Sequence, residues 1–310
     1  MKIRIIALLL CLCLTAGLIS GCGDLPSKED DAKLQIVTTL FPQYDFARQL
    51  CGDRAEITLL LPPGVESHSY EPTPADMIKI NEADLFIYTG QYMEPWAEQI
   101  IEGLTSDDVT VVDASQGIQL DASHEEEEDG DGHDHAYDPH IWTSPVLAQQ
   151  MVANIADALC EEDPEGEGIY RQREDDYQKQ LQELDEKFST IISEASRKEI
   201  VFAGRFAFHY FAERYGLTYV AAFASCSHEG EPSAKTIAQM IDIIRQEHIP
   251  VVFYEELTDP KVARSISEET GCEMLLLHSC HNVSKQDFDN GVTYLSLMEQ
   301  NAENLKKGLN

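Results

Sequence analysis

The chain has 310 residues, and its 22 basic and 56 acidic side chains give a formal net charge of −34. A surface this acidic repels phosphate backbones and anionic lipid headgroups, so the charge argues against nucleic-acid binding and favours cations as partners. The length is too great for one ordinary small core and suits two domains.

The N-terminus has the pattern of a secretory signal peptide. Two basic residues precede an apolar run over residues 5–19, which ends in Ser20-Gly21-Cys22. The run is shorter than the roughly 18 residues that a membrane-spanning helix requires, and small residues before a cysteine are typical of lipoprotein processing. We therefore expect cleavage after residue 21 and an extracytoplasmic protein that is lipid-anchored to the cell membrane through Cys22. An ordinary signal peptide, cut elsewhere, is the alternative.

Residues 22–33 are acidic and polar, which predicts a tether. From Leu34 onward, strand-like runs alternate with helix-like runs, a pattern that favours parallel sheets with helical crossovers. Thr73-Pro74 supplies a cap and a helix-compatible proline in front of the second helix. The predicted strands of this part are 34–39, 56–61, 85–89 and 109–113, and the predicted helices are 43–50, 75–82 and 94–104.

Residues 169–195 carry apolar side chains mostly three, four or seven positions apart, which predicts one long amphipathic helix. A coiled coil is the alternative, but α/β patterns flank the segment on both sides. We predict an α/β fold with an N-terminal lobe over 34–165, a connecting helix over 166–197 and a C-terminal lobe over 198–310. Each lobe has a short, mostly parallel sheet, and a ligand cleft lies between the lobes. The strands of the second lobe are expected at 200–203, 218–223, 251–255 and 274–277, and its helices at 206–215, 233–247, 260–270 and 292–307.

Histidines occur where the cleft is expected. His68 follows the second predicted strand and His278 follows the last one. Neutral imidazole is the commonest protein ligand for zinc, and a zinc site takes three or four such donors. A lone loop histidine is more often a solvated surface residue, but several at strand ends favour a metal site.

The segment 124–135 is a loop of carboxylates, glycines and three histidines, with no apolar period. We expect His124, His133 and His135 to gather divalent cations weakly, and a merely solvated acidic loop is the alternative. A calcium EF-hand is excluded because the spacing of its ligands is missing.

Five cysteines follow the predicted anchor, and an odd number cannot all pair. None lies in a C-x-x-C motif, so a thiolate zinc finger is not indicated. We expect one disulfide, with Cys226 and Cys280 as the suggested pair, and otherwise buried thiols.

Several motifs together resemble those of the metal-binding solute receptors of ABC importers, the zinc and manganese class. They cover nearly the whole mature chain in the same order and include the histidine-rich loop typical of zinc members. The resemblance implies two α/β lobes joined by a long rigid helix, one metal between them, and delivery of that metal to an ABC permease by a monomer. The motifs are residues 63–74, Asp138-Pro139-His140-Ile141-Trp142, Tyr215-Gly216-Leu217, Glu231-Pro232-Ser233 and residues 294–301.

By this resemblance His68 and His140 are metal ligands. The family usually has a histidine two residues before an Ala-Phe pair, but this chain has Arg205 there, and arginine cannot coordinate a metal. Arg205 is expected either to pair with a carboxylate or to exclude an additional cation. His209, one helical turn further on, is a conceivable substitute, although a surface position is its alternative.

The family's usual aspartate after the last strand is also changed, to His278. We therefore expect the ligands His68, His140 and His278, with His281 or Cys280 as a possible additional donor and water as the remaining choice. An imidazole-rich set favours zinc over manganese, which stays possible.

Two other functions were weighed against metal capture. A lipid-anchored adhesin or interaction protein of the same fold is one alternative. A secreted zinc hydrolase is the other, supported by the pair His133 and His135 but opposed by the lack of an H-E-x-x-H motif. We expect no enzymatic activity.

Overall fold

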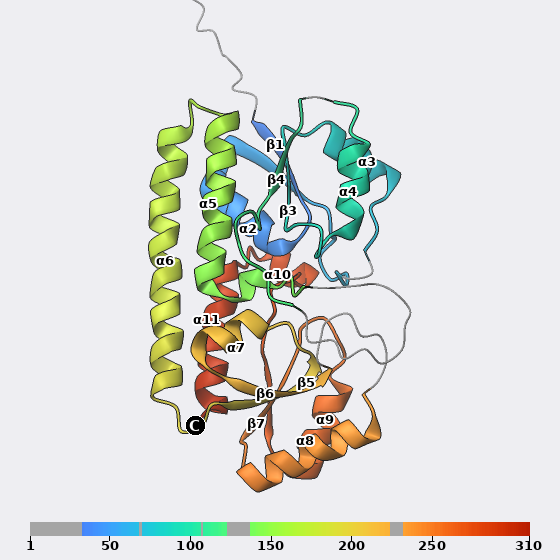
Figure 1. Cartoon of the computed structure of the whole chain (residues 1–310), viewed down its shortest axis with the longest axis vertical. Coiled ribbons are helices and arrows are strands. Elements are labelled where there is room, and N and C mark those ends of the chain that lie inside the picture. The colour runs from blue at the N-terminus through green and yellow to red at the C-terminus, as the bar shows by residue number, and fades with distance from the viewer. Residues whose placement is uncertain (1–32, 68–69, 107, 123–136, 224–231) are drawn as a thin grey trace, which may run out of the picture. The chain divides into compact units, whose positions relative to one another are not determined.

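The computed structural model describes residues 33–67, 70–106, 108–122, 137–223 and 232–310. Residues 34–310 form one compact unit that contains two four-stranded sheets. Figure 1 shows the two sheets with helices packed around each, and the long helix α6 (Glu167–Ser193) running beside both. The predicted α/β class, with two lobes and a long helix, is confirmed.

The first sheet has the strand order β2-β1-β3-β4, and every pairing is parallel. One face packs against α2 and α5, and the other face, with Phe86, packs against Ile80 of α3 and Ile100 of α4. Thr73 caps α3 in a reciprocal capping box with Asp76, as the sequence predicted. The elements are β1 (Leu34–Thr38), α2 (Phe41–Cys51), η1 (Gly52–Arg54), β2 (Ala55–Leu59), α3 (Pro74–Asn81), β3 (Leu85–Tyr88), α4 (Pro95–Glu102) and β4 (Thr110–Asp113).

The second sheet has the order β6-β5-β7-β8 and is also entirely parallel. Helices α8 and α9 cover one face, where Met240 and Ile266 are buried against Val252. Its elements are β5 (Glu199–Arg205), α7 (His209–Tyr215), β6 (Thr218–Phe223), α8 (Ala234–Glu247), β7 (Val251–Tyr254), α9 (Lys261–Thr270), β8 (Glu273–Leu276), α10 (Lys285–Asp289) and α11 (Tyr294–Gly308).

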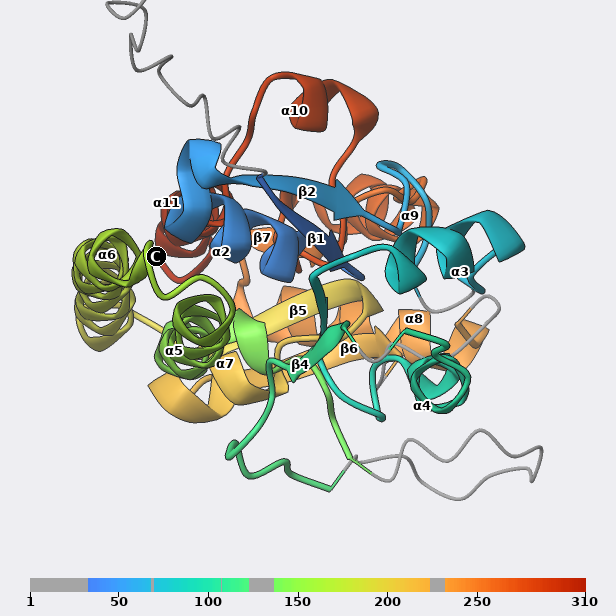
Figure 2. The ribbon, with the colours of Figure 1, turned by 90° about the horizontal axis from the view of Figure 1, so that it is seen from above.

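The long helix α6 (Glu167–Ser193) lies beside both sheets (Figures 1 and 2). Its buried residues are spaced three, four or seven apart, the stripe expected of an amphipathic helix. They join one apolar core that includes Phe46 of α2, Phe202 of β5 and Tyr294 of α11, so residues of both lobes share this core. The helix therefore belongs to a globular core, and the coiled-coil alternative is wrong. The buried residues of α6 are Tyr170, Tyr177, Leu181, Leu184, Phe188 and Ile192.

Helix α5 (Pro145–Glu162) and the short η2 (Ile141–Thr143) were not anticipated from the sequence. The pattern was present, because α5 buries Ala148, Met151, Ile155 and Leu159 at helical spacing. The ends of several predicted elements also shift by one to three residues, as the short α7 shows. No helix in the part of the chain that the structure describes is long and apolar enough to cross a membrane.

The loops after the parallel strands are tied together across the two sheets. The Gly64 N–H donates to the Val283 carbonyl at 2.8 Å, and the Asn282 amide donates to the carbonyls of Pro62 and Val65 at 2.8 and 2.9 Å. The Phe41 N–H donates to the His281 carbonyl at 3.2 Å. The loop that follows β8 is thereby held against the loop that follows β2, which places their side chains beside one another.

Candidate metal centre

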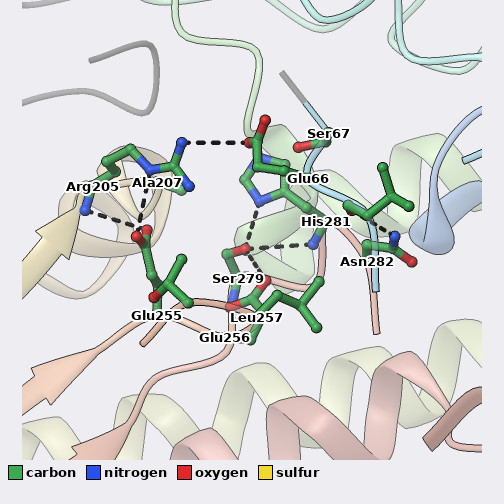
Figure 3. Close-up of a pocket in the computed structure, with 12 residues that line it drawn as sticks. Glu66, Ser67, Arg205, Ala207, Glu255, Glu256, Leu257, Ser279, His281 and Asn282 are labelled. Atoms are coloured by element: carbon green, nitrogen blue, oxygen red, sulfur yellow. Dashed lines mark hydrogen bonds and ion pairs between the residues drawn. The ribbon is translucent and has the colours of Figure 1, made fainter. Parts of the chain in front are cut away.

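A cavity of about 50 Å³ lies among these loops (Figure 3). Its walls come from residues 65–67 after β2, the end of β5, residues 255–258 after β7 and residues 279–282 after β8. Because the carboxyl ends of parallel strands are where small ligands bind in α/β folds, this is the expected place for a site. The lining residues are Val65, Glu66, Ser67, Arg205, Ala207, Glu255, Glu256, Leu257, Thr258, Ser279, His281 and Asn282.

His140 and His281 come from different lobes and lie in contact. Their ring centroids are 4.7 Å apart, and both side chains are buried. Trp142 packs edge-on against both rings, at 5.5 Å from His140 and 5.0 Å from His281. Two buried imidazoles at this spacing can supply two of the three or four donors that a zinc site requires.

The Nδ1 atom of each imidazole contacts a carboxylate, directly in His140 and through a hydroxyl group in His281. His140 Nδ1 lies 2.7 Å from Asp138 Oδ1. His281 Nδ1 lies 2.5 Å from the Ser279 hydroxyl, which in turn donates to Glu256 Oε1 at 2.5 Å. Metal-binding histidines usually carry such a partner on the nitrogen away from the metal. The Nε2 atom is therefore the coordinating nitrogen that the arrangement favours in both rings.

The electrostatics around Asp138 suit this role. Burial raises the pKa of Asp138, but its attraction to His140 and the hydrogen bonds from that residue outweigh burial, so the pKa lies below its usual 3.8. Asp138 is therefore ionised at neutral pH and can orient the His140 ring.

The backbone that carries His281 is fixed on both sides. The indole N–H of Trp142 donates to the Ser279 carbonyl at 2.8 Å, and the Tyr294 hydroxyl donates to the Trp142 carbonyl at 2.6 Å. Cys280 has a positive φ of 64°, which is uncommon for a residue with a side chain. This left-handed residue separates His278 from His281 and turns the chain between them.

His278 belongs to a different set of contacts. Its Nδ1 accepts the Cys280 N–H at 3.0 Å and lies 3.6 Å from Glu256 Oε1. Among the described residues that line the cavity, His281 appears and His278 does not. The structure thus brings His281 together with His140, while His278 braces the loop; the ligand role expected for His278 stays a prediction.

Arg205, where the resemblance led us to expect a histidine, pairs with two carboxylates. Its guanidinium lies 3.4 Å from Glu66 Oε1 and 3.4 Å from Glu255 Oε1. The backbone N–H of Arg205 donates to Glu255 Oε2 (Figure 3). Burial raises the pKa of Glu255, and the Arg205 charge opposes that shift. The expectation that Arg205 pairs with a carboxylate is confirmed.

Several predicted residues lie outside the described part of the chain. They are His68, the loop histidines His124, His133 and His135, and the anchor Cys22. Cys280 is a buried free thiol, so the suggested disulfide with Cys226 is wrong. Burial raises the pKa of the Cys280 thiol well above 9.0, which keeps it neutral and makes it a poor donor.

Residues 36–308 match the family of the zinc-uptake complex component A, periplasmic. The chain is 36% identical to the high-affinity zinc uptake system protein ZnuA of Bacillus subtilis over 301 residues, covering 94% of each chain. The Zn(II)-bound ZnuA-like domain of Streptococcus pneumoniae AdcA is 31% identical with a TM-score of 0.76, and the match covers 89% of this chain and 99% of that one.

A second similar solved structure is that of the laminin-binding protein Lmb of Streptococcus agalactiae, described as a bifunctional protein with adhesin and metal transporting activity. It is 28% identical with a TM-score of 0.76, and the match covers 89% of this chain and 100% of that one. The family match over residues 36–308 and the 36% identity to the Bacillus subtilis protein both extend over most of the chain. The chain belongs to the family of periplasmic zinc-uptake complex component A.

Proposed function

We propose that this protein captures zinc outside the cytoplasm and delivers it to an ABC permease, without catalysing a reaction. The observation that carries the proposal is the pair His140 and His281, two buried imidazoles from different lobes. A carboxylate holds Nδ1 of His140 directly, and another holds Nδ1 of His281 through the Ser279 hydroxyl. We assign His140 and His281 as ligands, and His68 as the third because its neighbour Ser67 lines the same cavity.

The size of the cavity supports an ion as the cargo. Sites for organic ligands usually occupy about 300 to 1,000 Å³, whereas this cavity measures about 50 Å³. That space holds an ion and a few waters. A hydrolase would also have to admit its substrate, so the cavity size argues against the zinc hydrolase alternative.

The donor set supports zinc over manganese. Imidazole nitrogen suits zinc, whereas manganese prefers carboxylate, carbonyl and water oxygens. Three carboxylates are among the described residues that line the cavity. Glu66 and Glu255 pair with Arg205, and Glu256 accepts from Ser279. These contacts leave imidazole as the main donor type.

The test is a competitive zinc titration, in parallel with manganese, on the chain from residue 23 to 310. His140→Ala and His281→Ala should each lose most of the high-affinity binding and keep the fold, measured by circular dichroism. His248→Asn is the matched control, because His248 is exposed and its left-handed backbone suits asparagine. Parent affinity in a His140→Ala/His281→Ala double variant would overturn the proposal.

The same titration decides between His278 and His281. His278→Ala removes an imidazole that accepts the Cys280 N–H, so we expect a modest loss of affinity through the loop. His281→Ala removes a donor and should cost far more. The reverse order would return the ligand role to His278.

Attachment to the membrane, the permease partner and the monomeric state are also part of the proposal. The pattern Ser20-Gly21-Cys22 supports lipidation of Cys22. Labelling cells with a fatty-acid probe should mark the parent chain and leave Cys22→Ala unmarked and released. Equal labelling of both would contradict the anchor.

An adhesin role is the second candidate, supported by the similarity to Lmb. Binding of the chain from residue 23 to 310 to immobilised laminin would test it. A signal that survives in the His140→Ala/His281→Ala variant would identify a function independent of the metal.

A further inference from the structure

A second group of metal-ligating side chains lies apart from the cavity. Asp121 precedes residues 123–136, and His209 and Glu213 belong to α7. One ligand atom from each of the three residues lies within 4.8 Å of the others. None of the three lines the cavity described above.

The spacing of the two closest donors matches a shared ion. His209 Nε2 and Asp121 Oδ2 are 3.2 Å apart. Two ligands bound at about 2.1 Å to one tetrahedral zinc lie about 3.4 Å apart. An ion could therefore bind between these two atoms with little movement. Glu213 lies four residues after His209, on the same face of the helix, and its side chain is exposed to solvent.

The first donor is held in place by its backbone. The Asp121 N–H donates to the Tyr210 hydroxyl at 3.0 Å, and that hydroxyl donates to the Asp138 carbonyl at 2.6 Å. The Asp138 N–H donates to the Asp121 carbonyl at 2.9 Å. A donor on a fixed backbone loses less entropy when it binds an ion than a donor on a free chain would.

We propose that Asp121, His209 and Glu213 form a second divalent-metal site, weaker than the first and open to solvent. One imidazole and two carboxylates bind zinc, and water completes the coordination sphere. The main chain of Asp138 holds Asp121, and the side chain of Asp138 orients His140. The two sites therefore share Asp138 as a supporting residue but have no ligand in common. A simple ion pair between protonated His209 and Asp121 is the competing explanation.

The test counts zinc ions by calorimetry on the chain from residue 23 to 310. The background carries His124→Gln, His133→Gln and His135→Gln, which remove the loop imidazoles without touching the three proposed ligands. We expect one tight and one weaker binding event. His209→Gln should weaken the second event by about tenfold or more, since even loss of a ligand's supporting partner costs about 10-fold to 100-fold.

Two controls make the result specific. Glu213→Gln should weaken the second event, whereas Glu183→Gln, which changes an exposed glutamate on α6, should not. At constant pH, zinc should also shift the ¹⁵N resonance of His209 Nε2. Protonation shifts this resonance without any metal, so a simple ion pair gives no shift that depends on zinc. A single event, or a second event unchanged in His209→Gln, would overturn the proposal. If the background protein shows the weaker binding event but not the tight one, the result counts against the main site and not against this second site.

Discussion

Arg205 joins the two lobes through Glu66, with its Nη1 atom 3.4 Å from the glutamate Oε1. The same guanidinium pairs with Glu255, so a cation is fixed at one wall of the cavity that His281 also lines. A permanent positive charge beside a proposed zinc site works against the ion while it neutralises the neighbouring carboxylates.

Arg205→Gln should therefore tighten zinc binding. Repulsion between one positive charge and a nearby divalent ion is worth several kcal/mol at an effective dielectric constant of about 20, so we expect an increase in zinc affinity of about tenfold or more. The free energy of unfolding should fall by about 1 kcal/mol at most, because Glu66 is partly exposed. Competitive titration and urea unfolding measure the two effects.

The control for that variant is Arg245→Gln, which removes an exposed cation paired with Glu269, and neither residue lines the cavity. It should leave the zinc affinity unchanged. If Arg205→Gln binds zinc no better than the parent, Arg205 does not repel the ion.

Ser279→Ala should weaken zinc binding without unfolding the protein. The Ser279 hydroxyl links His281 Nδ1 to Glu256, and loss of such a supporting partner costs about 10-fold to 100-fold in metal affinity. Ser279→Thr keeps the hydroxyl and should retain most of the affinity. Equal losses in the two variants would show that packing, and not the hydroxyl, is what matters.

Glu94 should make the protein less stable as the pH rises. The carboxyl is buried beside β3, where it accepts from Thr39 and Thr89, and burial raises its pKa to about 8 despite those hydrogen bonds. Nearby Asp113 raises the pKa further. In the unfolded chain the group ionises near its ordinary pKa of 4.5. The stability of the protonated form is thus fully present below that value and is lost between about 4.5 and 8, at about 1.4 kcal/mol per pKa unit.

Glu94→Gln removes this titration. We compare the free energy of unfolding of the variant with that of the parent at each pH, measured by urea unfolding. The difference in favour of the variant should be larger at pH 8 than at pH 5. A difference that does not change with pH would mean that Glu94 ionises normally in the folded protein.

Two glycines should respond oppositely to alanine. A Cβ on Gly308 of α11 would lie 2.5 Å from the Phe253 ring, so Gly308→Ala should cost about 1 to 3 kcal/mol through overpacking. A Cβ on Gly168 of α6 meets nothing within 4 Å, so Gly168→Ala should stabilise the helix by about 0.5 to 1 kcal/mol. Thermal unfolding of both variants checks the signs, and a stabilised Gly308→Ala would contradict the packing described for α11.

Much of the fold followed from local patterns in the sequence. The alternation of strand and helix runs predicted two parallel sheets, and the apolar stripe from Tyr170 to Ile192 predicted α6, because both periods are local properties of the chain. Helix α5 was missed although its apolar residues recur at helical spacing. That spacing is visible in the sequence, so α5 could have been predicted without any tertiary information.

The site was harder to predict because it depends on the direction of one turn. His278 and His281 both follow the last strand, and the resemblance pointed to His278, with His281 only as a possible additional donor. The left-handed Cys280 and the hydrogen bond from Trp142 to Ser279 turn His281 toward His140. The cluster of Asp121, His209 and Glu213 joins residues about ninety positions apart, a contact that no local period reveals.

The core that runs beside α6 constrains how an ion can leave. A wide hinge opening between the sheets would pull apart the rings of Phe46 and Tyr294, now 5.0 Å apart, and would break the hydrogen bond from Tyr294 to Trp142. Exposing that apolar surface to water costs about 25 cal/mol for every Å². Displacement of the short loops after β2 and β8, with the helices unmoved, therefore costs less free energy than hinge opening. A partner that receives the ion would act on those loops.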